Sequence, residues 1–132
     1  MARPQTKWLL ETTILVDLLR GDKSARAWVD SIPETSRAIS VITAAELVAG
    51  CRNRTEQRAV EREIDLYEMV WLTEEISQTA LEFYKRFHLS HGVGFLDCMI
   101  AASASANELR LATLNLKHLE QFPDLQVERP YS

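Results

Sequence analysis

Three acidic residues stand where their carboxylates could share one site. Glu11 directly follows the apolar run Trp8-Leu9-Leu10. Glu46 lies one helical turn after Thr43, and Asp97 begins a segment rich in alanine and serine. Carboxylates in one cleft repel each other, and oxygen-rich sites of this kind are what Mg²⁺ or Mn²⁺ prefer. Since a bound divalent ion can activate a water molecule and clamp phosphate oxygens, these residues would suit phosphodiester hydrolysis if the fold brings them together.

Each acidic residue also has a simpler structural explanation. Thr43 and Glu46 have the spacing of a helix capping box, in which both side chains satisfy backbone amides. Asp97 in the first turn of a helix would complement the helix dipole, and Glu11 before a helix could do the same. Spacing alone therefore leaves open whether these carboxylates form a site.

The hydrophobic pattern indicates the elements that must position them. Short apolar runs alternate with longer amphipathic ones, which is typical of an α/β domain with a parallel sheet. The predicted strands cover residues 7–10, 37–40, 69–72 and 110–113, with 125–127 as an edge strand. The predicted helices cover 14–19, 24–31, 43–49, 55–68, 74–87, 95–108 and 116–122.

Hydroxyl and amide side chains follow two of the predicted strands. Thr12 and Thr13 come after the first strand, and Thr113 and Asn115 come at the end of the fourth. Ligands of open parallel sheets bind beyond the carboxyl ends of the strands. We therefore expect these four residues to support the acidic ones through hydrogen bonds, although Thr113 and Asn115 could be ordinary turn residues.

The composition is that of one globular domain over residues 1–132. Apolar residues make up 46% and charged residues 26%, which excludes a disordered or fibrous chain. Fifteen basic and 19 acidic residues give a net charge of −4, so any contact with nucleic acid must be local or use metal ions. No apolar run approaches the ~20 residues of a membrane helix, and no signal peptide is visible. We therefore expect a cytoplasmic protein with reduced cysteines.

Four segments, in order along the chain, resemble the motifs of PIN-domain proteins of the VapC toxin type. The first is a hydrophobic strand followed by Asp-Thr-(Ser/Asn) and an apolar helix, the second S-x-x-T-x-x-E-L, the third D-x-x-I-A-A-x-A, and the fourth T-x-(D/N)-x-x-(H/D)-F. In this chain they read LLETTILVDLLRG over 9–21, SVITAAEL over 40–47, DCMIAASA over 97–104 and LATLNLKHL over 111–119. Each motif is weak singly, but four in the family order are specific.

The resemblance implies a three-layer α/β/α fold with a central parallel sheet of four to five short strands. It also implies a metal-dependent endoribonuclease toxin that uses Mg²⁺ or Mn²⁺ to cut RNA. A VapB-like antitoxin and a homodimer, or a heterotetramer with that antitoxin, are the implied partners. Carried over by position, Glu46 and Asp97 match catalytic, metal-binding acids, while Asn115 and Thr113 match family positions close to the site.

Glu11 is the main departure from the family pattern, which has Asp at this position. Glutamate keeps the charge but reaches up to roughly 1.5 Å further, and a misplacement of ~1 Å can cost ~10²-fold in rate. We therefore predict a metal site that includes Glu11 but is loosened, and an attenuated nuclease. The alternative is a degenerate, non-catalytic PIN domain that binds an antitoxin or dimerises. A phosphoacceptor regulatory domain is disfavoured, because its Asp would stand where this chain has Leu72-Thr73.

Several residues outside the motifs are weaker candidates. Arg54, Arg58 and Arg62 recur every four residues, which suggests an RNA phosphate path, although interleaved glutamates favour a solvated face. Lys117 is a further weak substrate contact. The histidine pair 88 and 91 has metal-ligand spacing but no third ligand nearby, and the three tryptophans are expected to be packed anchors.

Overall fold

The computed structural model describes residues 7–132, and its centre is a five-stranded parallel sheet. The strand order is β3-β2-β1-β4-β5, with β1 in the middle. The strands are β1 (Trp8–Leu10), β2 (Arg37–Ser40), β3 (Glu68–Val70), β4 (Arg110–Ala112) and β5 (Val127–Glu128). The first six residues, where a signal peptide would begin, lie outside the described part.

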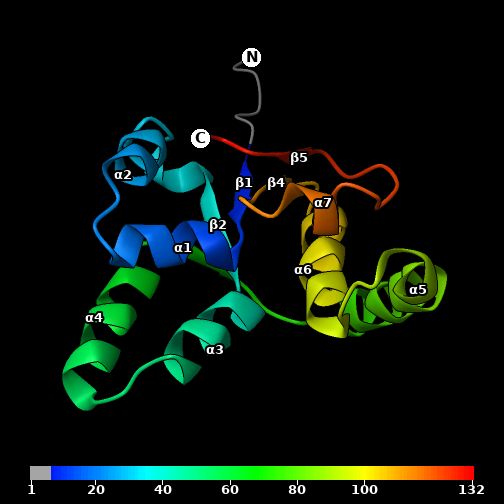
Figure 1. Cartoon of the computed structure of the whole chain (residues 1–132), viewed down its shortest axis with the longest axis horizontal. Helices are drawn as coiled ribbons and strands as arrows, with labels where there is room; N and C mark the ends of the chain where they lie inside the picture. The colour runs from blue at the N-terminus through cyan, green and yellow to red at the C-terminus, as the bar shows by residue number, and fades with distance from the viewer. Residues whose placement is uncertain (1–6) are drawn as a thin grey trace.

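Helices cover both faces of this sheet and give the expected three-layer α/β/α architecture (Figure 1). One layer contains α1 (Thr12–Leu19), α2 (Lys23–Asp30), α3 (Val41–Ala49) and α4 (Arg54–Ile64). The other contains α5 (Glu74–His91), α6 (Phe95–Ala106) and the short α7 (Leu116–Leu119). Within residues 7–132, none of these helices has the length and apolar character needed to cross a membrane.

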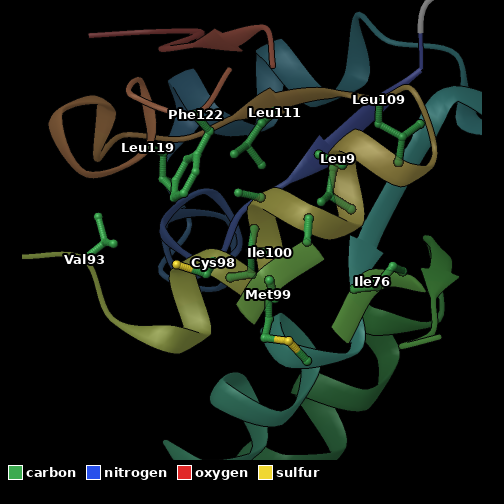
Figure 2. Close-up of a cluster of buried hydrophobic side chains, with 14 of the residues drawn as sticks. Leu9, Ile76, Val93, Cys98, Met99, Ile100, Leu109, Leu111, Leu119 and Phe122 are labelled. Atoms are coloured by element: carbon green, nitrogen blue, oxygen red, sulfur yellow. The ribbon is translucent and has the colours of Figure 1, made fainter. Parts of the chain in front are cut away.

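Alternating strand residues build two hydrophobic cores, one on each face. Leu9 and Leu111 are fully buried beneath α5 and α6, whereas Leu10 and Ala112 are fully buried beneath α1 to α4. This follows from the period of two in a strand, which sends successive side chains to opposite faces. Figure 2 shows Leu9, Leu111 and Phe122 gathered over α6.

The small-residue face of α6 is buried as the sequence predicts. The alanines at 101, 102 and 104 are completely inaccessible. Because small side chains let a helix axis approach the sheet closely, α6 packs tightly between the sheet and α5. Its first turn, which carries Asp97, is thereby fixed relative to the strands.

Several boundaries differ from the sequence prediction. The third helix begins at Val41 rather than 43, because the Ser40 side chain caps it by accepting the Ile42 amide at 3.0 Å. Thr43 is therefore inside the helix and fully buried, and the capping-box explanation for Thr43 and Glu46 is wrong. The fifth helix runs to His91 instead of 87 and ends at Gly92, whose φ of +65° suits a residue without Cβ.

Other boundaries shift by smaller amounts or shorten an element. The fourth helix stops at Ile64 rather than 68, β3 is 68–70 rather than 69–72, and the seventh helix ends at 119 rather than 122. The edge strand is 127–128 rather than 125–127. One burial expectation is also wrong, since Trp71, expected to be a packed anchor, is 66% exposed.

Candidate acidic site at the carboxyl end of the sheet

The topology brings the predicted site residues to one edge of the sheet. Glu11 follows β1, and β4 pairs with β1 in parallel, so Thr113 emerges beside Glu11. The next strand, β2, leads directly into α3 and Glu46. Asp97 lies in the first turn of α6, which runs back to the start of β4, so this turn lies at the carboxyl edge.

Glu11 is buried and acts as the N-cap of α1. The residue is 7% exposed, and one carboxylate oxygen, Oε1, accepts three hydrogen bonds. The donors are the Thr13 amide at 3.2 Å, the Thr13 hydroxyl at 2.5 Å and the Thr113 hydroxyl at 2.6 Å. The carboxylate is therefore held before any ligand binds.

Both threonine hydroxyls are oriented by backbone amides. Thr13 Oγ1 accepts from Leu114 N at 3.0 Å, and Thr113 Oγ1 accepts from Asn115 N at 2.9 Å. A hydroxyl has one proton to donate, and in each case that proton goes to Glu11. This network joins the end of β1 to the loop after β4.

Glu46 is exposed but is held from α1 rather than from its own helix. Thr12 Oγ1 donates to Glu46 Oε1 at 2.8 Å and lies 3.0 Å from Thr43 Oγ1. Thr12 is next to Glu11 in the chain, so these contacts hold Glu46 at the same edge of the sheet as Glu11. The roles of Thr12 and Thr43 as a support for Glu46 explain the spacing that resembled a capping box.

Asp97 faces His118, a residue to which sequence reasoning gave no role. His118 Nδ1 lies 3.9 Å from Asp97 Oδ2, within ion-pair distance when the imidazole is protonated but too long for a hydrogen bond. The His118 amide donates to the Asn115 carbonyl at 3.2 Å, which places the imidazole one turn beyond the Thr113–Asn115 loop. The signal for it was present, since His118 occupies the H/D position of the fourth motif.

The donor set suits a hard divalent cation, because carboxylate oxygens are what Mg²⁺ and Mn²⁺ prefer. Among residues 7–132, however, no three His, Cys, Asp or Glu side chains lie close enough together to hold an ion. The structure thus brings Glu11, Glu46 and Asp97 to one edge of the sheet without assembling them into a three-ligand cluster. Their role as metal ligands stays a prediction.

Two cavities border Thr12, the residue that holds Glu46. One, of about 600 Å³, is lined by Glu46, Thr12 and apolar residues of α1, α3 and α4. The other, of about 410 Å³, is lined by Thr12, Thr13, Asn115 and the α1 residues that follow. The Asn115 side chain is exposed at this second cavity and is available to a ligand there. The larger cavity borders Glu46, and the smaller one borders the loop after β4.

The basic stripe on α4, formed by Arg54, Arg58 and Arg62, has fewer acidic neighbours than its sequence suggests. Arg54 and Arg58 line a shallow cavity of about 400 Å³. Two of the three interleaved glutamates bind elsewhere: Glu56 pairs with Arg52 at 2.8 Å, and Glu63 pairs with Arg26 at 2.8 Å. The third, Glu61, accepts from Gln57 at 3.1 Å and lines the same cavity as Arg54 and Arg58. Within residues 7–132, the three arginines of the stripe form no ion pair, so a role as anion contacts stays a prediction.

The other candidates fall outside the site. His88 packs against Tyr84, with ring centroids 5.0 Å apart, and His91 packs against Phe87. Both histidines therefore make aromatic contacts within α5. Lys117 is exposed on α7 beside His118. Cys98 is completely buried, and burial raises the pKa of its thiol to about 11, which makes it a poor nucleophile.

Sequence comparison identifies the same family that the four motifs resemble. The model of the PIN domain matches residues 8–124. The ribonuclease VapC10 of Mycobacterium tuberculosis is 37% identical over 120 residues, covering 89% of this chain and 90% of that protein. The ribonuclease VapC19 of the same species is 34% identical over 121 residues, covering 89% of this chain and 96% of that protein.

Comparison with solved structures gives a consistent result for the fold. DNA-bound VapBC from Salmonella typhimurium contains a chain that is 25% identical, with a TM-score of 0.79 over 94% of this chain and 98% of that one. FitAcB from Neisseria gonorrhoeae contains a chain that is 26% identical, with a TM-score of 0.75 over 92% of this chain and 96% of that one. The sheet order and the helix layers are therefore those of a known group of proteins.

Proposed function

This chain belongs to the PIN domain family, within its VapC group, and we propose that it is an endoribonuclease toxin of a type II toxin–antitoxin system. The observation that carries the proposal is the placement of three acidic residues, from three separate segments, at one edge of the sheet. Threonine hydroxyl groups donate hydrogen bonds to two of them: Thr113 to Glu11 and Thr12 to Glu46. Relatives of 34–37% identity over nearly the full chain are ribonucleases by name, which supports the same activity here.

The proposed cofactor is a divalent cation, Mg²⁺ or Mn²⁺, with Glu11, Glu46 and Asp97 as the residues that would hold it. When bound, such an ion supplies a more acidic water molecule and neutralises phosphate charge. The protein holds one oxygen of Glu11 and one of Glu46 through threonine hydroxyls, which leaves the Oε2 atom of each without a hydrogen bond within residues 7–132. These two oxygens are the donors that a ligand would meet.

The proposed attenuation comes from Glu11. Its carboxylate bends back onto Thr13 and Thr113 as a helix cap, and no three-ligand cluster forms within the described residues. Binding a cation would therefore require the acidic side chains to approach each other first, which lowers the apparent affinity. The same observation favours the second candidate, a non-catalytic PIN domain that only binds its antitoxin.

The proposed partners are an RNA substrate and a VapB-like antitoxin, with the toxin as a homodimer or in a heterotetramer with the antitoxin. The 600 Å³ cavity beside Glu46 has apolar walls formed by Val16, Leu47 and Val60. An amphipathic antitoxin segment that filled it would cover Thr12 and Glu46. Neutralisation of the toxin would then follow from blocked access to the acidic site.

The activity test uses the purified chain with total RNA and several structured and single-stranded RNAs, in Mn²⁺, in Mg²⁺ and in EDTA. We expect metal-dependent cleavage that stops in EDTA and in an Asp97→Asn variant. The Glu11→Asp variant is assayed in parallel to detect an activity too weak in the natural sequence. RNA that stays intact with all three proteins and both metals would contradict the nuclease, and a retained antitoxin complex would then favour the binding module.

A further inference from the structure

One face of α1 forms a ridge between the two cavities described above. Thr12, Val16 and Arg20 line both cavities, of about 600 and 410 Å³. They recur every fourth residue and therefore share one face of the helix. Thr12, at one end of the ridge, holds Glu46, whereas Arg20 stands at the other end, where α1 stops.

Arg20 is the unpaired cation of this ridge. Its side chain is exposed and makes no hydrogen bond or ion pair within residues 7–132. Arg52, which also lines the larger cavity, is bound by Glu56 at 2.8 Å. Asp17, which lines the smaller one, accepts the hydroxyl of Tyr131 at 2.9 Å and does not pair with Arg20.

The fold does not need the Arg20 guanidinium. Only its backbone contributes to the end of α1, where the Arg20 amide donates to the Val16 carbonyl at 3.0 Å and the Gly21 amide donates to the Leu18 carbonyl at 3.1 Å. Gly21, with a φ of +80°, then turns the chain away. An unpaired cation thus lies beside two cavities that also border Thr12, the larger of which borders Glu46 as well.

An acidic site repels the phosphates of its own substrate, so binding energy for a nucleic acid must come from cations outside it. Building on the proposed ribonuclease function, we propose that Arg20 binds a backbone phosphate of the RNA strand that lies along α1. Arg20 follows Thr12 by eight positions, which corresponds to a rise of ~12 Å along the helix. At ~3.4 Å per stacked nucleotide, that phosphate is about three nucleotides from the cleaved bond.

The first test measures binding without cleavage. Fluorescently labelled uridine oligomers of two, four, six and eight nucleotides are titrated with the protein in EDTA at several salt concentrations. We expect Arg20→Gln to weaken binding of the longer oligomers about fivefold to tenfold and to reduce the salt slope by ~0.7, the value for one lost phosphate contact on a single strand. The dinucleotide, too short to reach Arg20, should bind both proteins equally.

Two matched variants control for charge and folding. Arg20→Lys keeps the cation and should restore the salt slope. Arg86→Gln removes an exposed arginine from α5, on the other face of the sheet, and should leave RNA binding unchanged. The unfolding midpoint of Arg20→Gln should match that of the natural chain, since only the backbone of this residue supports the helix end.

A second test uses turnover and separates this inference from the proposed function. If the natural chain cuts RNA, Arg20→Gln should raise KM about fivefold to tenfold while kcat stays within about twofold. If the natural chain cuts RNA and Arg20→Gln has unchanged KM, oligomer affinity and salt slope, the role of Arg20 would be overturned but the proposed ribonuclease function would be retained. A natural chain that neither binds the oligomers nor cuts RNA would overturn both. If Arg20→Gln binds RNA normally but forms a weaker complex with the antitoxin, the proposed phosphate contact would also be overturned, and Arg20 would be assigned to a protein interface.

Discussion

The hydroxyl of Thr113 donates a 2.6 Å hydrogen bond to Glu11 Oε1, across 102 positions of the chain and in a buried setting. This bond joins the ends of the two neighbouring strands β1 and β4 at the edge of the sheet where the site lies. Glu11 therefore has two roles that its sequence position alone does not separate. It caps α1 and fixes the loop after β4, and it is also a candidate ligand.

Thr113→Val should destabilise the protein by ~1–3 kcal/mol. Valine keeps the volume but removes the donor to Glu11 and the acceptor for the Asn115 amide, and unsatisfied buried polar groups are costly. The measurement is urea unfolding followed by circular dichroism. Thr113→Ser, which keeps the hydroxyl, is the control and should retain most of the hydrogen-bond contribution. Equal stability of the valine variant and the natural chain would show that the network contributes nothing to folding.

Glu11→Asp should raise the ribonuclease rate, by an amount up to ~10²-fold, since an error of ~1 Å in placement can cost that much. The shorter carboxylate matches the residue that the family carries and is less able to bend back onto Thr113. The rate is measured on one RNA with Mn²⁺ and with Mg²⁺. Glu46→Asp is the matched control and should lower the rate, because its shortened carboxylate retreats from Thr12. A rate for Glu11→Asp equal to or below that of the natural chain would refute the geometric argument.

The fold could be predicted from the sequence because its signals are local and periodic. The alternation of Leu9 and Leu10 between two cores, and the small buried face of α6, both follow from side-chain period and size. The helix end before Gly21 follows from the freedom of glycine at positive φ, whereas the helix before Gly92 runs to His91 and not to residue 87 as its periodicity predicts. These features predict the order of strands and helices along the chain and the edge of the sheet at which the acidic residues lie.

The remaining features depend on contacts between distant segments. Ser40 and Thr43 are both good cap residues, and only the end of β2 and the burial of Thr43 against Thr12 decide between them. The bend of Glu11 toward Thr113 depends on the register of β1 with β4. The exposure of Trp71 could not be predicted either, because an apolar residue reads the same whether it faces the core or an outer surface.

Thr12→Val should lower kcat about tenfold or more with a smaller effect on KM. The hydroxyl holds Glu46 Oε1 at 2.8 Å, and without it the exposed glutamate samples other rotamers. Thr12→Ser keeps the donor and should retain activity, which distinguishes a positioning role from a packing role. The pair is compared by steady-state kinetics on one RNA, and a valine variant with full kcat would mean that Glu46 needs no support.

Cys98 should remain unreactive in the folded protein, and its titration should weaken the fold at high pH. Burial raises the pKa of this thiol from 9.0 to about 11, so the folded state retains a proton that the unfolded chain loses. The stabilisation that this provides is complete below pH 9 and is lost as the pH rises toward 11. Tyr67 and Tyr131, whose pKa values are raised by burial and by hydrogen bonds to Glu63 and Asp17, add to the same trend. Urea midpoints measured from pH 8 to 11 should therefore fall, and the fall should be shallower in Cys98→Ala.

A thiol reagent at pH 8 should modify the partly exposed Cys51 alone in native protein and both cysteines in urea. Rapid modification of Cys98 in the native state, or the same pH slope in both proteins, would contradict this account of its burial.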